Sequence, residues 1–396
     1  MAPLTLRPQG TALFRWLGLA FLSFAIAGCV PRSTRPTTQL PTEPVLRPEE
    51  PRVNPRLPAD ETRNRVAVLV PLTGRDAGLG QAILNAANLA LLDMGGERIR
   101  ITAYDTAGAG GAVRAANEAI AEGNGLILGP LLAEDVRAVA PLARQNDVPV
   151  IAFSNDVAVA GNGVFLMGFT PGQSIARVVT FARSRGAQSF GALVPVNVYG
   201  ERAARAMTQA VEGAQGRLVG VQTFEPSAAG VRGASTRLLA QGGVDAVLLA
   251  DVPRAILPGL PVLRAASPQP RLLATERWAS ESNIGANVAL RGAWFAAPSD
   301  TMYNQFRTRY RARYNTQPFR LASLGYDAVL LTVRIAANWQ VGRTFPAREL
   351  RDREGFSGVD GAFRFGRDGV ADRALEVREV TATGTNVVSP APPNFN

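Results

Sequence analysis

The stretch that decides the fold is RVAVLVPLTG, residues 65–74. Its apolar run, Val66–Val70, has the length of a strand and no polar residue, which is typical of a strand buried on both faces of a sheet. A helical pattern follows at Ile83–Met94, and a second strand pattern at Ile99–Tyr104. A strand, a turn, a helix and another such strand predict a parallel sheet covered by helices on both faces.

The same alternation continues along the chain and then starts a second time. Further strands are predicted at Leu126–Leu128 and Val148–Phe153. The second series has its predicted strands at Gly191–Val194, Leu218–Phe224, Ala246–Ala250 and Leu272–Ala274. We therefore expect an α/β fold of two doubly wound parallel-sheet lobes, with about three hinge crossings near Gly168, Ala297 and Gly342.

Composition and pattern divide the chain into segments. We predict a lipoprotein signal peptide at 1–28, a lipidated Cys and Pro-rich disordered tether at 29–64, a first lobe at 65–169 plus 298–342, a second lobe at 170–297 plus 343–382, and a flexible tail at 383–396. The alternating segment Gly361–Val380 predicts hairpin strands around a Gly-Arg-Asp-Gly turn, which we place on the second lobe.

The N-terminus carries a secretion signal. Trp16–Ala27 is an apolar run too short to span a bilayer as a stable helix. It ends in Ile26-Ala27-Gly28-Cys29, which resembles the bacterial lipobox and implies lipidation of Cys29. An ordinary signal peptide with an incidental Cys is the alternative. By resemblance to the sorting rule of such lipoproteins, Val30 in place of Asp favours the outer membrane over the inner one.

The composition excludes several chemistries. The chain has no His and one Cys, and all 42 of its basic residues are Arg. No Ser-His-Asp triad, Cys-His pair, Lys Schiff base or common zinc site can form without these residues. We expect no enzyme activity, no cofactor and no metal, although a carboxylate-only hydrolase stays open. The net charge of +10 favours anionic surfaces, but nothing resembles a nucleic-acid module.

Several ordered motifs carry a family resemblance. They are Val70-Pro71-Leu72-Thr73-Gly74, Gly129-Pro130-Leu131, Phe165–Pro171, Asp245-Ala246-Val247 followed by Pro253, Leu324-Gly325-Tyr326-Asp327-Ala328, and Gly358-Val359-Asp360-Gly361 followed by Arg373-Ala374-Leu375. Together they resemble the type I periplasmic binding proteins for leucine, isoleucine and valine. They are more similar still to the penicillin-binding protein activator lipoproteins.

The resemblance implies a function without chemistry of its own. It implies an outer-membrane-anchored periplasmic lipoprotein that binds and activates a bifunctional peptidoglycan synthase, a penicillin-binding protein, and touches the membrane only through its N-terminal lipid. The alternative is a solute receptor of an ABC importer for an amino acid or amide. The best-known activators carry a helical-repeat domain before this fold, where this chain has the Pro-rich segment.

The lobes are expected to form a cleft at the carboxyl ends of their strands, where such folds bind ligands. The candidate cleft residues are Thr73, Gly74, Gly129, Pro130, Ser154, Asn155, Tyr199, Asp251 and Glu276. Tyr199 would stack on a ligand or close the lobes. Asp251 and Glu276 would bind an amine or serve as loop and capping residues.

Two further stretches bear on ligand and partner. Amino-acid receptors of this fold usually place a Ser or Thr after the Gly-Pro, whereas this chain has Leu131-Leu132-Ala133-Glu134. We expect Glu134 to repel a ligand carboxylate, which argues against amino-acid capture. The arginine-rich run 307–313 is either a solvated helix with an aromatic seam or a docking face for a partner.

Overall fold

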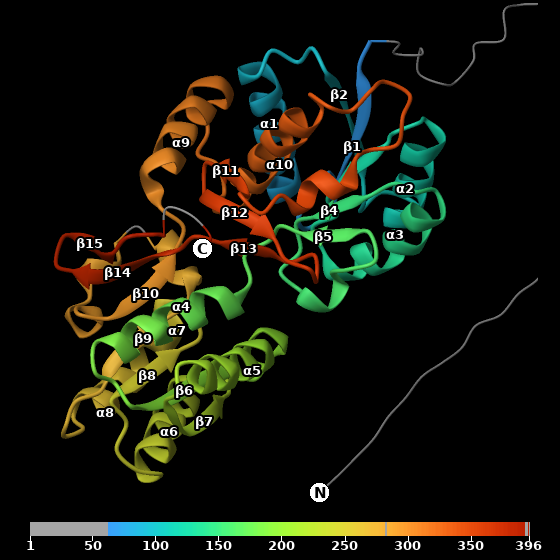
Figure 1. Ribbon diagram of the computed structural model, residues 1–396. Coiled ribbons are helices and arrows are strands. Elements are labelled where there is room, and N and C mark those ends of the chain that lie inside the picture. Colours follow the sequence, from blue (N-terminus) through green and yellow to red (C-terminus); the bar gives the residue numbers. More distant parts are fainter. Residues whose placement is uncertain (1–61, 282, 393–394, 396) are drawn as a thin grey trace, which may run out of the picture. The chain divides into compact units, whose positions relative to one another are not determined.

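The computed structural model describes residues 62–281, 283–392 and 395. The predicted signal peptide, the lipidated Cys29 and nearly all of the Pro-rich segment lie outside these residues. The predicted α/β fold with two lobes of largely parallel sheet is confirmed (Figure 1). Within the described part of the chain, no helix combines the length and the apolar character needed to cross a membrane.

The first lobe is built on a five-stranded sheet in the order β2-β1-β3-β4-β5. Its strands are β1 (Asn64–Val70), β2 (Ile99–Asp105), β3 (Leu126–Leu128), β4 (Val150–Ala152) and β5 (Val164–Leu166). All neighbouring strands are parallel. Their carboxyl ends therefore meet at one edge of the sheet, which is where ligands bind in such folds.

Side chains alternate along β1 into two separate cores. Val66, Val68 and Val70 pack on one face, while Ala67 and Leu69 pack on the other. The first face is covered by α1 (Ala77–Asp93), α9 (Asp300–Tyr314) and α10 (Ser323–Ile335), and the second by α2 (Gly111–Ala121) and α3 (Ala133–Gln145). This explains why the strand is apolar at every position from Val66 to Val70.

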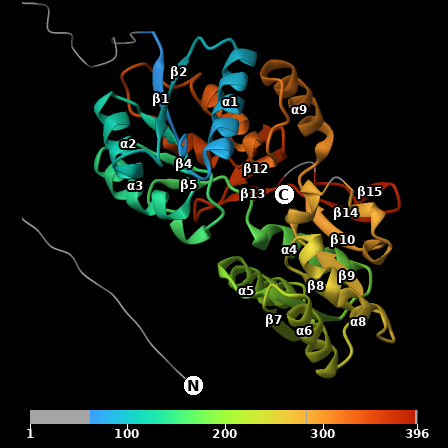
Figure 2. The ribbon, with the colours of Figure 1, turned by 180° about the vertical axis from the view of Figure 1, so that it is seen from behind.

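The second lobe has a seven-stranded sheet in the order β15-β14-β10-β9-β8-β6-β7. Its strands are β6 (Ser189–Pro195), β7 (Arg217–Phe224), β8 (Ala246–Leu249), β9 (Arg271–Ala274), β10 (Trp294–Ala297), β14 (Glu376–Thr381) and β15 (Gly384–Ser389). The last two strands are antiparallel to their neighbours, so this sheet is mixed. Helices α4 (Pro171–Ser184) and α5 (Val198–Gly213) cover one face, and α6 (Ala228–Ala240), α7 (Pro253–Ile256) and α8 (Leu260–Arg264) the other (Figure 1, and from behind in Figure 2).

The predicted C-terminal hairpin segment, Gly361–Val380, divides between the lobes: β14 at its end lies in the second sheet, as predicted, but the strands before it lie on the first lobe. Strands β11 (Phe356–Gly358), β12 (Gly361–Phe365) and β13 (Ala371–Arg373) form a small antiparallel sheet. Its aromatic residues Phe356, Phe363 and Phe365 belong to the same core as α1 and α10. Alternation fixed the strand character of this segment, but it could not tell which lobe offers the complementary surface.

Two boundaries shift as a consequence. The third crossing between the lobes falls at 374–375, between β13 and β14, and not near Gly342. The predicted tail from 383 contains β15, which pairs with β14 at the edge of the second sheet. The helical segment 253–264 is broken into α7, a 3-10 turn and α8, because Pro258 and Pro261 interrupt it.

Candidate functional site

A pocket of about 650 Å³ lies between the two lobes. Its volume is in the usual range for small-molecule sites. Residues from both lobes line it, namely Asp76, Leu79, Leu131, Leu132, Phe153, Asn155, Phe169, Pro298, Arg320 and Leu321 on the first lobe side and Asn197, Tyr199, Val252, Glu276, Arg277, Ala279 and Ser280 on the second. Most of them follow the carboxyl end of a strand or begin a helix, as the fold predicts.

The first lobe gives the pocket an apolar wall. The side chains concerned are Leu79, Leu131, Leu132, Phe153, Phe169 and Leu321, and all of them pack on the core shared by α1 and α10. The exceptions on this side are Asp76, which precedes α1, together with Asn155 and Arg320. The guanidinium nitrogens of Arg320 are buried, and one lies 2.7 Å from the Asp360 carboxylate. A ligand would therefore meet hydrocarbon over most of this wall.

The second lobe gives the pocket a polar wall centred on Glu276. The Ser174 hydroxyl donates to Glu276 Oε2 at 2.5 Å, and the Tyr199 hydroxyl lies 3.3 Å from Oε1. Tyr199 also donates to Thr275 Oγ1 at 2.9 Å. Burial raises the pKa of the Glu276 carboxyl, and it likewise raises the pKa of the Tyr199 hydroxyl. Glu276 is therefore held by its own neighbours and resists ionisation.

Asp251, the second acid predicted to bind an amine, is also hydrogen-bonded within the protein. Asp251 Oδ1 accepts from Arg277 Nη1 at 2.9 Å and from its neighbour's backbone, Val252 N, at 2.7 Å. The Arg277 guanidinium stands 4.8 Å from the centroid of the Tyr199 ring, and its side chain is 36% exposed. A ligand ammonium would have to displace Arg277 to reach Asp251. The accessible charge of the polar wall is thus positive.

An ion pair joins the two lobes beside the pocket. Arg202 on α5 lies 2.8 Å from Asp156 Oδ2, and it donates to Asn155 Oδ1 at 3.3 Å. Asp156 follows β4 in the first lobe and is also 2.5 Å from Arg137 on α3. Asp156 is nearly buried, so its charge depends on these two guanidinium groups for compensation.

The structure brings only part of the predicted set together. Asn155, Tyr199 and Glu276 line the pocket. The other predicted residues, Thr73, Gly74, Gly129, Pro130, Ser154 and Asp251, do not line it but stand within three residues of one that does. Thr73 donates to Asp105 Oδ2 at 2.7 Å, at the end of β2. Ser154 is buried and accepts from Asp156 N at 3.2 Å.

Gly129 has a backbone role instead of a ligand role. Its φ of +99° is in the region that favours glycine, and a Cβ there would overlap the carbonyl oxygen of Leu69 on the neighbouring strand. The glycine lets the chain turn at the end of β3, through a cis bond to Pro130, and present Leu131 and Leu132 to the pocket.

The expectation for Glu134 was wrong, and other residues were missed. Glu134, in the first turn of α3, is exposed and does not line the pocket. The expected repulsion of a carboxylate therefore does not arise. Arg277, Phe153 and Phe169 were not predicted. Arg277 directly follows Glu276 in the sequence, but nothing in the sequence shows that its charge faces inward.

Two doubly wound lobes with a ligand-sized pocket between the ends of their strands define a class, the two-lobed binding proteins. The sequence matches the periplasmic binding protein family over residues 64–385, and the chain belongs to that family. The family indicates an extracytoplasmic location.

Solved structures agree with this fold. The leucine binding protein LivK of Thermotoga maritima is 20% identical, with 83% of this chain and 99% of that chain covered and a TM-score of 0.58. A solute binding protein of R. palustris in complex with benzoate is 19% identical, with 84% and 97% covered and a TM-score of 0.61. The LpoA C-domain from Haemophilus influenzae, a regulator of PBP1A, is 18% identical, with 82% and 100% covered and a TM-score of 0.67. These structures are of binding proteins and a regulator, and at such identities they show the fold alone.

One curated relative gives no information about activity, because it is itself uncharacterized. An uncharacterized protein of Rickettsia prowazekii is 27% identical over 142 residues, which is 36% of this chain and 38% of that protein. The match thus spans about two fifths of the relative's length. Among the described residues, no group of three or more Cys, Asp or Glu side chains could hold a metal ion.

Proposed function

We propose that this protein is a periplasmic lipoprotein, anchored in the outer membrane through Cys29, that binds and activates a peptidoglycan synthase. One observation carries the proposal. The two acids predicted to take a ligand amine are both engaged by the protein itself, Glu276 by Ser174 and Tyr199, and Asp251 by Arg277. The pocket is thus poorly arranged for amino-acid capture, and the likeness to the LpoA C-domain supports a regulator.

Reconstituted synthesis tests the proposal. The mature protein is added to the organism's own bifunctional penicillin-binding protein, and glycan polymerisation and peptide cross-linking are followed together. We expect either rate to rise several-fold and to saturate with the added protein. A matched control is Cys29→Ser, which should activate equally in detergent solution but fail to restore wall synthesis in cells. Unchanged rates at saturating, demonstrably folded protein would refute the proposal.

A second function is favoured by the chemistry of the pocket. Its apolar wall and the exposed guanidinium of Arg277 suit a small carboxylate without an amine, and the R. palustris neighbour is in complex with benzoate. Calorimetry against benzoates and the twenty amino acids separates the two functions. Micromolar binding of a benzoate that is lost in Arg277→Gln would favour the solute receptor, whereas amino-acid binding would point to Asp76 as the amine partner.

A further inference from the structure

Helix α9 has two contrasting faces. Tyr303, Phe306 and Tyr310 are buried against the first lobe. One flank of its exposed surface carries Arg307 and Arg311, which we call the arginine face of α9. Both are exposed, and neither has an acidic partner among the described residues. The helix thus stays attached through its aromatic seam, and its outward guanidinium groups are not needed for that attachment.

Arg309, on the same helix, differs from Arg307 and Arg311 because it has a carboxylate partner. Arg309 Nη1 lies 2.9 Å from Asp93 Oδ2 on α1, and the Tyr326 hydroxyl donates to the same oxygen at 2.6 Å. Arg307 and Arg311 are one helical turn apart, so their like charges lie side by side without compensation. Such a pair is stabilised when a carboxylate is placed between the two groups.

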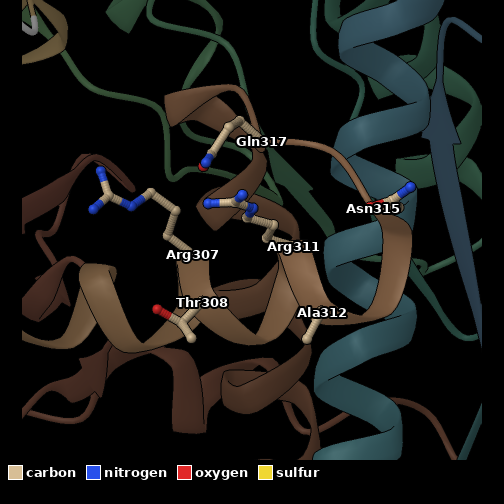
Figure 3. A pocket seen from close by; sticks show the side chains of 6 residues that line it. All are labelled: Arg307, Thr308, Arg311, Ala312, Asn315 and Gln317. Carbon is tan, nitrogen blue, oxygen red and sulfur yellow. The ribbon is translucent and has the colours of Figure 1, made fainter.

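The arginine face is hollowed. A recess of about 440 Å³ is lined by Arg307, Thr308, Arg311, Ala312, Asn315 and Gln317. Asn315 ends the helix with a φ of +53°, which turns the chain so that Gln317 lies beyond the two arginines (Figure 3). The hydroxyl and amide groups add directional hydrogen-bond partners to the two charges. This recess suits inserted carboxylate side chains better than a flat surface would.

An apolar anchor lies close by in the chain. Phe319 is 55% exposed, and its ring is near Gly78 at the start of α1, where an added Cβ would lie 4.0 Å from its Cε2. Arginine and aromatic side chains are the residues that carry most binding energy in protein interfaces. Binding to an anionic membrane usually takes a cluster of four to eight cations, more than the two on this face.

We propose that the arginine face of α9, together with Phe319, which follows the recess residue Gln317 closely in the chain, is the docking surface for an acidic segment of the partner synthase. The inference rests on the proposed function, because it names the surface through which that partner binds. The carboxylates of the segment enter the recess and pair with Arg307 and Arg311, while an apolar side chain covers Phe319.

Charge reversal tests the surface directly. The variant is Arg307→Glu/Arg311→Glu, and the matched control is Arg205→Glu/Arg232→Glu on α5 and α6 of the second lobe. All four positions are exposed, and both variants change the net charge equally. We measure the affinity of the full-length proteins for the purified bifunctional synthase by surface plasmon resonance. The face variant should lose about tenfold or more, and the control should stay within about twofold to threefold of wild type.

Phe319→Ala supplies a second variant that leaves every charge in place. It should weaken binding several-fold, and circular dichroism should show all variants folded, since each changed side chain is exposed. Equal binding by wild type and face variant overturns this inference while the proposed function stands. If wild type does not bind the synthase at all, the proposed function fails and the assignment of this partner fails with it. The face variant is also tested on vesicles with 30% phosphatidylglycerol. If it loses binding to the vesicles but not to the synthase, the arginine face is a membrane surface, and the inference is overturned.

Discussion

Buried charges gather where the motifs of the sequence meet. Asp327 on α10 accepts from Val359 N at 2.7 Å and from Asp360 N at 3.4 Å, and Asp360 pairs with Arg320. Arg373 donates to Met167 O at 2.6 Å. The Gly-Tyr-Asp-Ala and Gly-Val-Asp-Gly motifs are therefore contact partners that hold the hairpin of the first lobe in place.

Asp327 makes stability depend on pH. Burial, followed by the charge of Asp360, raises its pKa to about 7, although Arg373 opposes the shift. An unfolded Asp titrates near 4, so the folded state binds more protons between about pH 4 and 7. The stability contributed by the neutral carboxyl is present below that window and is lost as pH rises through 7.

Asp327→Asn should flatten this dependence. The amide oxygen can still accept from Val359 N, but no charge is forced into the buried site at high pH. We expect the free energy of unfolding of the wild type to fall from pH 5 to pH 8 more than that of the variant. Denaturant titrations at each pH unit measure the difference. Parallel curves for the two proteins would show that Asp327 does not cause the pH dependence.

At the scale of elements, apolar runs predicted most of the parallel strands. β1, β2 and β3 were found because each is apolar or follows a helical pattern. β5 was not, since only a short 3-10 turn and no helical pattern separates it from β4. The lobe to which β11–β13 belong could not be predicted either. The small sheet is held on the first lobe by a β-bridge between Leu166 and Val370 and by the contact between the Phe165 and Phe365 rings. Each of these contacts joins residues that are far apart in the sequence.

The sequence predicted which loops reach the pocket, but it did not predict which of their side chains line it. The loops after Pro130, Ser154 and Asp251 do reach the pocket, because parallel strands bring their carboxyl ends together. Which side chain of each loop points inward depends on turn geometry and on long-range ion pairs. Arg277 and Arg202 illustrate this limit, because both partners lie far away in sequence.

Phe363→Ala should test the lobe assignment of the hairpin. Phe363 on β12 is 1% exposed and lies 5.7 Å from the Phe356 ring and 6.0 Å from the Phe365 ring, centroid to centroid. Truncation should cost about 3–5 kcal/mol. Hydrogen exchange should then rise in β1–β5 and leave β6–β10 protected. Phe319→Ala is the control, since its exposed ring contributes little to the core, and loss of protection in β6–β10 would contradict the assignment.

At the scale of the whole body, buried arginines hold the crossings between the lobes. Arg373 reaches the first crossing through Met167 O, and Arg378 donates to Pro298 O at 2.6 Å in the second. Arg378 also pairs with Asp300 and Glu376, at 2.5 Å and 2.7 Å. These bonds fix the crossings themselves. The relative position of the lobes away from the crossings then depends on contacts at the pocket, of which the pair of Arg202 with Asp156 is one.

Arg202→Gln should shift the lobes toward a more open arrangement. The side chain of Arg202 is 20% exposed and that of Asp156 5%, so water screens the pair only in part. A contribution of about 1 kcal/mol would change the ratio of closed to open forms about fivefold. Spin labels at Ala138→Cys on α3 and Gln209→Cys on α5, in a Cys29→Ser background, report the distance between the lobes by pulsed electron resonance.

Arg137→Gln is the matched control for this experiment. Arg137 pairs with the same carboxylate at 2.5 Å, and its loss changes the charge by the same amount, but both partners lie in the first lobe. It should therefore leave the distance distribution between the labels as in the wild type. If both variants broaden the distribution equally, the charge of Asp156 and not the bridge between the lobes governs the opening. If neither variant does, contacts elsewhere hold the pocket closed.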